Sequence, residues 1–166
     1  VEPSSRTFDV LRNNSFINKD RFVCIRKAIG DRADVAVLRG SKHEARSICG
    51  AAGAGGEHVE VIALNSLVES AHISAGERLV IKLDVEGVEI PAVSGAARRL
   101  EGDAIVICEE HGSDRHHTVS RHILEKTSLK LFCHDPRAGC FRRITDVASL
   151  DHIKRFRNRG YNVFAT

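Results

Sequence analysis

The clearest hydrophobic pattern in the chain is the apolar run at Leu79–Leu83, which ends at an acidic turn that contains glycine. Apolar positions then recur with helical spacing over residues 88–100. A short apolar run followed at once by a helix is typical of half a βαβ unit. Ligands of such units bind at the carboxyl ends of the strands, where this chain places Asp84, Glu86 and Glu89. Three carboxylates are costly there unless they meet water, a cation or a hydrogen-bonding ligand, so we expect chemistry at this turn.

The remaining pattern predicts an α/β fold, because strands and helices alternate over the later two-thirds of the chain. Such alternation is typical of a mostly parallel sheet with helices on both faces, and a closing strand–turn–strand pair indicates an antiparallel C-terminal edge. A turn is expected at residues 28–31 and a loop at residues 42–56. The predicted strands cover residues 22–25, 33–38, 59–64, 104–108, 129–133, 140–144 and 161–165, and the predicted helices follow Ser4 or Ser5 and cover residues 66–72, 114–126 and 146–158.

The composition fits one folded domain over residues 1–166, which is long enough to bury a core. Hydrophobic residues make up 42% of the chain and charged residues 28%, as in ordinary globular proteins. The net charge of +3 is too small to indicate nucleic-acid binding. We expect the basic residues near the end to form a solvated helix face; they are Arg142, Arg143, Lys154, Arg155, Arg157 and Arg159.

The chain has no apolar stretch long enough to span a membrane and no visible secretory signal. Its five cysteines include no CxxC pair. An odd number of cysteines without a disulfide framework indicates reduced thiols and a cytoplasmic setting.

Residues 82–89, with the sequence KLDVEGVE, resemble the K-I-D-V-E-G-x-E core of the FkbM-type family of S-adenosylmethionine-dependent methyltransferases. Residues 93–96 resemble the V-L-x-G-A stretch that follows this core in the family. Weaker matches lie in family order along nearly the whole chain, at residues 1–3, 28–31, 64–67, 109–111 and 162–164.

The resemblance implies a Rossmann-like methyltransferase sheet, mostly parallel with an antiparallel C-terminal edge. The family begins with a strand and a glycine-rich loop for the cofactor, and nothing before Val1 supplies them. We therefore expect one methyltransferase-like domain, residues 1–166, that is truncated at its N-terminus and binds cofactor weakly or not at all as it stands. Without that first strand, the strand at residues 79–83 would have an unpaired flank. An open strand edge invites association, so a homo-oligomer is possible.

The implied activity is transfer of a methyl group from S-adenosylmethionine to a hydroxyl of a small molecule, a sugar or a glycolipid. The implied partner is such an acceptor, with no nucleic acid involved. By resemblance, Glu2 accepts hydrogen bonds from the ribose hydroxyls of the cofactor, and Ala28 and Ile29 flank its adenine ring. Asp31 would accept from the adenine amino group, and Asp84 would lie close to the cofactor cation.

The catalytic candidates are Asp84, Glu86, Glu89 and His111. Methyl transfer depends on in-line positioning, and a hydroxyl acceptor also loses a proton, which His111 or Asp84 could take. Glu109 would share the face of His111 if the strand continues that far, because the two are two residues apart. A simpler reading of Glu86 and Glu89 is that acidic residues are favourable at a helix N-terminus.

Two further function classes stay open. The chain could be a non-catalytic methyltransferase-like module for interaction or assembly, since Asn65 stands where the family usually has Asp. A dinucleotide-dependent oxidoreductase shares the fold type, but no G-x-G-x-x-G lies in the right context. The histidines between residues 111 and 122 lack ligand spacing, so no metal site is expected.

Overall fold

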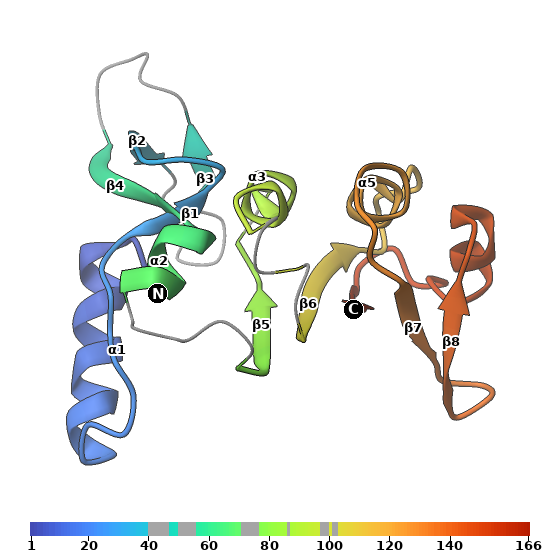
Figure 1. Cartoon of the computed structure of the whole chain (residues 1–166), viewed down its shortest axis with the longest axis horizontal. Helices are drawn as coiled ribbons and strands as arrows, with labels where there is room; N and C mark the ends of the chain where they lie inside the picture. The colour runs from blue at the N-terminus through green and yellow to red at the C-terminus, as the bar shows by residue number, and fades with distance from the viewer. Residues whose placement is uncertain (40–46, 50–55, 71–76, 86, 97–99, 101–102) are drawn as a thin grey trace. The chain divides into compact units, whose positions relative to one another are not determined.

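A computed structural model describes residues 1–39, 47–49, 56–70, 77–85, 87–96, 100 and 103–166. The chain divides into two compact units. Unit 1 comprises Val1–Ala71 and Val85–Ala96, and unit 2 comprises His72–Asp84 and Ala97–Thr166 (Figure 1). The single domain expected from the sequence stays a prediction.

Unit 1 is built on a four-stranded sheet in the order β1-β4-β2-β3. β1 pairs parallel with β4, whereas β2 is antiparallel to both β4 and β3. Aliphatic side chains from three strands form its core: Ala28, Ala36, Leu38 and Val59, with Val61 packed against them. The elements are α1 (Ser5–Ile17), β1 (Ala28–Gly30), β2 (Asp34–Arg39), β3 (Ser47–Cys49), β4 (Glu57–Ala63), α2 (Leu64–Ser70) and α3 (Glu89–Ser94).

Gly95, at the end of α3, lets this helix approach the end of β1 closely. A Cβ atom on Gly95 would overlap the carbonyl oxygen of Gly30 and lie 3.1 Å from Cα of Asp31. The backbone N–H of Asn65 donates to the carbonyl of Gly95 at 3.0 Å. Because Gly30 pairs with Ala63, this packing brings Asp31 and Asn65 to the same edge of the sheet in unit 1.

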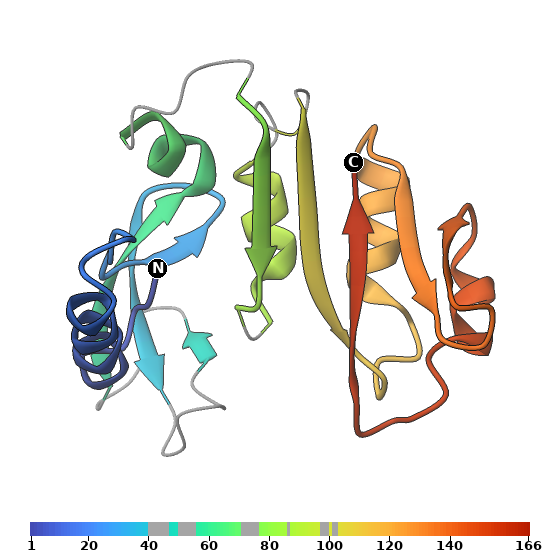
Figure 2. The same ribbon diagram turned by 90° about the horizontal axis from the view of Figure 1, so that it is seen from below.

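Unit 2 is built on a five-stranded sheet in the order β5-β6-β9-β7-β8. β5 and β6 are parallel, and β9 lies antiparallel between β6 and β7, as Figure 2 shows. The elements are β5 (Leu79–Leu83), β6 (Ala104–His111), α5 (Thr118–Lys126), β7 (Leu131–Asp135), β8 (Cys140–Ile144), the 3₁₀ helix η2 (Val147–His152) and β9 (Gly160–Ala165).

The two faces of this sheet differ in burial. Along β6, alternate residues from Ala104 to Glu110 are buried, and those between them are exposed or half-buried. The buried face packs against α5, which lies behind the strands in Figure 2. On the opposite face, the paired residues Val80 and Ile105 are 71% and 44% exposed. The pleat of β6 therefore separates a packed side from a more open side.

The α/β class predicted from the sequence is confirmed. The strand pairing differs from a mostly parallel sheet, because among the described pairings only β1 with β4 and β5 with β6 are parallel. The hairpins β2–β3 and β7–β8 and the inserted strand β9 make the other pairings antiparallel. Within the described residues β5 pairs with β6 alone and forms one edge of its sheet, as expected.

Several local predictions were wrong. Residues 22–25 are assigned no strand, and the ladder of unit 1 begins instead at Ala28, where a turn was expected. The predicted helix at residues 146–158 is a short 3₁₀ helix that ends at His152. Beyond it, Lys154 is fully buried rather than on a solvated face. Its ammonium group is buried because hydrogen-bond acceptors on other elements take the place of water around it. Most of the predicted loop at 42–56 lies outside the described residues, but Ser47–Cys49 within it forms strand β3 and not a loop.

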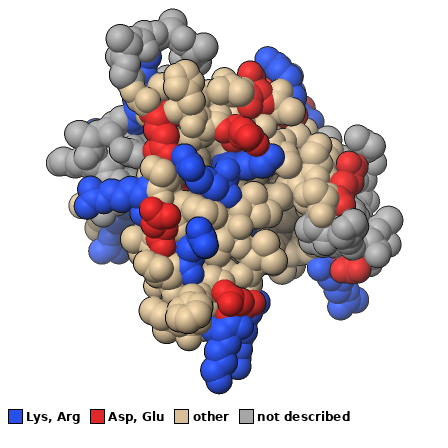
Figure 3. Space-filling model, turned by 90° about the vertical axis from the view of Figure 1, so that its left-hand side faces the viewer, with Lys and Arg blue, Asp and Glu red and all other residues tan. Residues whose placement is uncertain are grey.

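On the face drawn in Figure 3, basic and acidic side chains are interspersed. No helix among the described residues has the length and apolar character needed to cross a membrane.

Candidate functional site

Four ionisable side chains gather at the carboxyl ends of β5 and β6, and we name them the acid cluster: Lys82, Asp84, Glu109 and His111. The parallel register pairs Leu83 with Cys108, so the next residues, Asp84 and Glu109, lie side by side. Lys82 is two residues before Asp84, and Glu109 is two residues before His111. The period of two in a strand therefore directs all four toward the more open face of the sheet.

The pKa values of the two carboxyl groups in the acid cluster are shifted in opposite directions. Lys82 Nζ donates to Asp84 Oδ2 at 2.6 Å, and this hydrogen bond, helped by one from Glu109, lowers the pKa of Asp84. The interaction with Asp84 raises the pKa of Glu109, and burial and the negative charge of Asp84 act in the same direction. A positive charge on His111 would lower the pKa of both groups.

Two neighbouring carboxyl groups that differ in this way can hold one proton between them. Asp84 is the member that stays ionised, and Glu109 is the stronger base. A base is useful in catalysis when its pKa is brought closer to the working pH. The acid cluster is thus suited to removing a proton from a bound hydroxyl.

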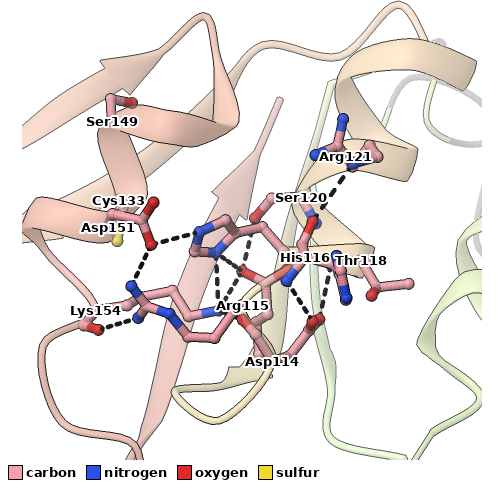
Figure 4. A network of polar contacts seen from close by, with 12 residues as sticks. Asp114, Arg115, His116, Thr118, Ser120, Arg121, Cys133, Ser149, Asp151 and Lys154 are labelled. Atoms are coloured by element: carbon pink, nitrogen blue, oxygen red, sulfur yellow. Dashed lines mark hydrogen bonds and ion pairs between the residues drawn. The ribbon is translucent and has the colours of Figure 1, made fainter.

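A second set of polar groups lies on the opposite, packed face of β6, and we name it the buried network (Figure 4). Lys154 Nζ donates to Glu110 Oε2 and to the carbonyl of Asp114, each at 3.1 Å. Ser120 donates to Glu110 twice, from its backbone N–H at 3.0 Å and from its hydroxyl at 2.9 Å. Lys154 and Ser120 are fully buried, and Glu110 is 2% exposed.

The protonation of His117 follows from its partners in the buried network. Lys154 Nζ lies 3.1 Å from His117 Nδ1. An ammonium group only donates, so Nδ1 accepts and the ring proton is on Nε2. Nε2 then donates to Asp151 Oδ1 at 3.3 Å, and Arg115 binds the same oxygen (Figure 4). Every proton of the ammonium group has an acceptor, so the network is suited to holding the fold together.

Cys133 lies beside the buried network, and its thiol has low reactivity. Burial, with the negative charge of Glu110, raises the pKa of its thiol to about 11. Cys24, Cys108, Cys133 and Cys140 form no disulfide.

The residues predicted to hold the cofactor belong to unit 1. Glu2 Oε1 accepts from the backbone N–H of Ser4 at 2.8 Å, near the start of α1. Ala28 packs in the sheet core, which differs from the expected wall of an open pocket, and Ile29 is also buried. Asp31 is exposed and pairs with Arg32 at 3.2 Å.

Asn65 has a side-chain oxygen that is buried and accepts from no donor among the described residues. It is the second residue of α2, which begins at the end of β4, at the sheet edge that also carries Asp31. A buried carbonyl oxygen without a donor costs free energy, so this position has capacity for an N–H or O–H from a ligand.

The structure brings together only part of the predicted catalytic set. Asp84 and His111 meet in unit 2 within the acid cluster. Glu89 is in unit 1, in the first turn of α3, where it accepts from the N–H of Gly87 at 3.3 Å. Glu86 lies outside the described residues. The sequence did not assign Glu109 a catalytic role. Its two-residue spacing from His111 does indicate, however, that the two side chains lie on the same face of the strand.

No family model matches the chain, and no curated protein or solved structure matches it. Within the described residues, no group of three or more His, Cys, Asp or Glu side chains is placed to hold a metal ion.

Proposed function

We propose that this chain is a methyltransferase that moves a methyl group from S-adenosylmethionine to a hydroxyl of a small molecule, a sugar or a glycolipid. The observation that carries the proposal is the Asp84–Glu109 pair at the carboxyl ends of the parallel strands β5 and β6. Ligands of α/β sheets bind at such ends. The pair provides a base there, which a hydroxyl acceptor requires.

The sheet of unit 2 supports the same proposal. Its parallel pair β5–β6 is followed by the antiparallel strands β9, β7 and β8. This order agrees with the antiparallel C-terminal edge of a Rossmann-like methyltransferase sheet. The ordered sequence matches around residues 82–89 add the family resemblance.

S-adenosylmethionine, when bound, supplies an electrophilic methyl group on a positively charged sulfur. The groups in unit 1 that would hold its nucleoside part are Glu2, Asp31 and Asn65. Carboxylate and amide oxygens fit a ligand that presents hydroxyl and amino donors, and the buried Asn65 oxygen without a donor is the observation that supports this fit. Ala28 contributes through the sheet core instead of lining the ligand.

In unit 2, the residues of the acid cluster act on the acceptor. Glu109 would take the proton of the acceptor hydroxyl, and S-adenosylmethionine, when bound, would supply the methyl group that becomes bonded to the hydroxyl oxygen. Lys82 keeps Asp84 ionised, and this negative charge raises the proton affinity of Glu109. The same charge favours a cation nearby.

The test is a transfer assay on the complete gene product with S-adenosylmethionine and a panel of hydroxyl acceptors. Formation of S-adenosylhomocysteine is measured by mass spectrometry. We expect Glu109→Gln and Asp84→Asn to lower turnover by at least about 100-fold, the scale of general base catalysis. Glu125→Gln is the matched control, because Glu125 is an exposed carboxylate on α5.

Binding of the donor is measured separately by calorimetry. Asp31→Asn and Asn65→Ala should weaken it, whereas Glu109→Gln should leave it nearly unchanged. Absence of both binding and transfer in the complete gene product would reject the proposal.

The second candidate is a non-catalytic module for interaction. The exposure of Val80 and Ile105 beside the edge strand β5 favours it, since apolar side chains on an open face are typical of association surfaces. Dimerisation that is lost in Val80→Lys, with no donor binding, would support this candidate over the methyltransferase.

A further inference from the structure

The side chain of Glu109 lies directly against the backbone of β9 at Gly160. A Cβ atom built on Gly160 would overlap Glu109 Oε1 and would lie 2.5 Å from its Cδ and 3.1 Å from its Cγ. The backbone of Gly160 is not among those with positive φ, so its conformation is open to any residue. An added side chain here would therefore disturb Glu109 rather than the local backbone.

We propose that Gly160 is a positioning residue for the acid cluster: its missing side chain leaves the space in which the carboxyl group of Glu109 lies beside Asp84. The catalytic consequence of this inference rests on the proposed function, but the positioning itself does not.

Several contacts hold the segment before Gly160 in place, so β9 cannot easily move away from β6. Lys154 is anchored through its side chain in the buried network, and its carbonyl accepts from Arg115 at 3.0 Å. The N–H of Gly112, just after β6, donates to the carbonyl of Arg159 at 2.7 Å. Gly160 itself pairs with His111 in the β6–β9 ladder. An added methyl group must therefore be accommodated mainly by movement of Glu109.

The groups around Glu109 decide what such a movement changes. Lys82 and Asp84 face it from β5, His111 lies two residues away on β6, and the neutral Asn162 is its partner on β9. Moving Glu109 changes its interaction with Asp84, which is the largest cause of the raised pKa of Glu109. The same movement changes one of the two hydrogen bonds that lower the pKa of Asp84.

The experiment is a carboxyl ¹³C NMR titration of Asp84 and Glu109 in the wild type, Gly160→Ala, Glu109→Gln and the double variant. In Gly160→Ala we expect the titrations of both Glu109 and Asp84 to shift from their wild-type positions, because the contact between the two carboxyl groups changes. In the Glu109→Gln background, the alanine should leave the titration of Asp84 unchanged, because its partner is already gone. Identical titration of Glu109 with and without the alanine would overturn the inference.

A folding defect in Gly160→Ala has its own control, Gly160→Ala combined with Glu109→Ala. If the overlap is with the Glu109 side chain, the double variant folds with wild-type-like amide spectra. If the double variant is as unfolded as the single one, Gly160 serves the backbone and the inference is wrong.

The titration needs no methyl donor, so its outcome stands apart from the transfer assay. Where transfer is measured, Gly160→Ala should lower kcat and move the pH profile, while KM for the donor stays unchanged. A merely structural role would change the amount of active protein without moving the pH profile.

Discussion

Glu109 and Glu110 are neighbours in sequence, yet they occupy opposite surroundings in the structure. Glu110 lies on the packed face of β6, where Lys154 and Ser120 satisfy both of its oxygens. Glu109 lies on the more open face, where the interaction that most affects its pKa is with another carboxyl group, that of Asp84. The pleat of the strand sends consecutive side chains to opposite faces.

The difference shows how one residue type serves two purposes. On the packed face a full set of donors compensates the charge, so Glu110 and Lys154 hold β6 to the segment after η2. On the open face the like charge of Asp84 is only partly compensated by Lys82, so Glu109 retains affinity for a proton. Perturbed titration of this kind is typical of functional sites, although structural ion pairs also cause it.

The strongest test of the comparison is Lys154→Met. It removes the cation and leaves Glu110 buried without its charge partner, which costs about 3–5 kcal/mol of unfolding free energy. Chemical denaturation measures the loss. Lys130→Met is the matched control, because Lys130 is exposed in the same unit and should change stability little.

Combining Lys154→Met with Glu110→Gln should recover part of the loss, because the uncompensated charge is then removed. If Lys154→Met were as stable as Lys130→Met, the buried network would not hold the fold in the way described.

A smaller contrast is expected between Cys133 and Cys140. The thiolate is the reactive form, and burial raises the pKa of Cys133 to about 11, whereas Cys140 is exposed on β8. At neutral pH Cys140 should alkylate roughly 100-fold faster or more. Time-resolved mass spectrometry of iodoacetamide labelling, with the denatured chain as reference, measures both rates. Equal rates in the folded protein would show that the packed face is open to solvent.

The smallest effect is expected from Glu109→Gln. The pKa of Glu109 is raised in the folded state, so its contribution to stability is present below the ordinary glutamate pKa of about 4.3 and is lost as pH rises through the raised value. A neutral glutamine should therefore raise Tm at neutral pH, by roughly a fraction of 1 kcal/mol in unfolding free energy because the site is half exposed.

Asp84→Asn should instead lower the unfolding free energy at neutral pH. The pKa of Asp84 is lowered, so its contribution is present above about 3.9 and is lost as pH falls through the lowered value. Calorimetry of both variants across this pH range checks the two signs together. If both substitutions stabilised the protein at neutral pH, Lys82 would not compensate Asp84.

Much of the acid cluster could be predicted from the sequence. The apolar run at 79–83 and its abrupt end placed Asp84 at a strand terminus, and two-residue spacing placed Glu109 and His111 on one face. These are local patterns, and periodicity reads them well. The α/β class followed from the alternation of elements in the same way. The burial of Lys154 did not follow, because its surroundings in sequence are basic and polar.

The sequence by itself determined where strands end in acidic residues and which neighbours share a face, because backbone geometry within one strand fixes both. Only the tertiary structure decided which partners these residues meet. Glu110 meets a lysine 44 positions away, and Glu109 rests on a glycine of β9. Such contacts depend on strand order and register across the sheet, which hydrophobic periodicity along a single strand does not encode.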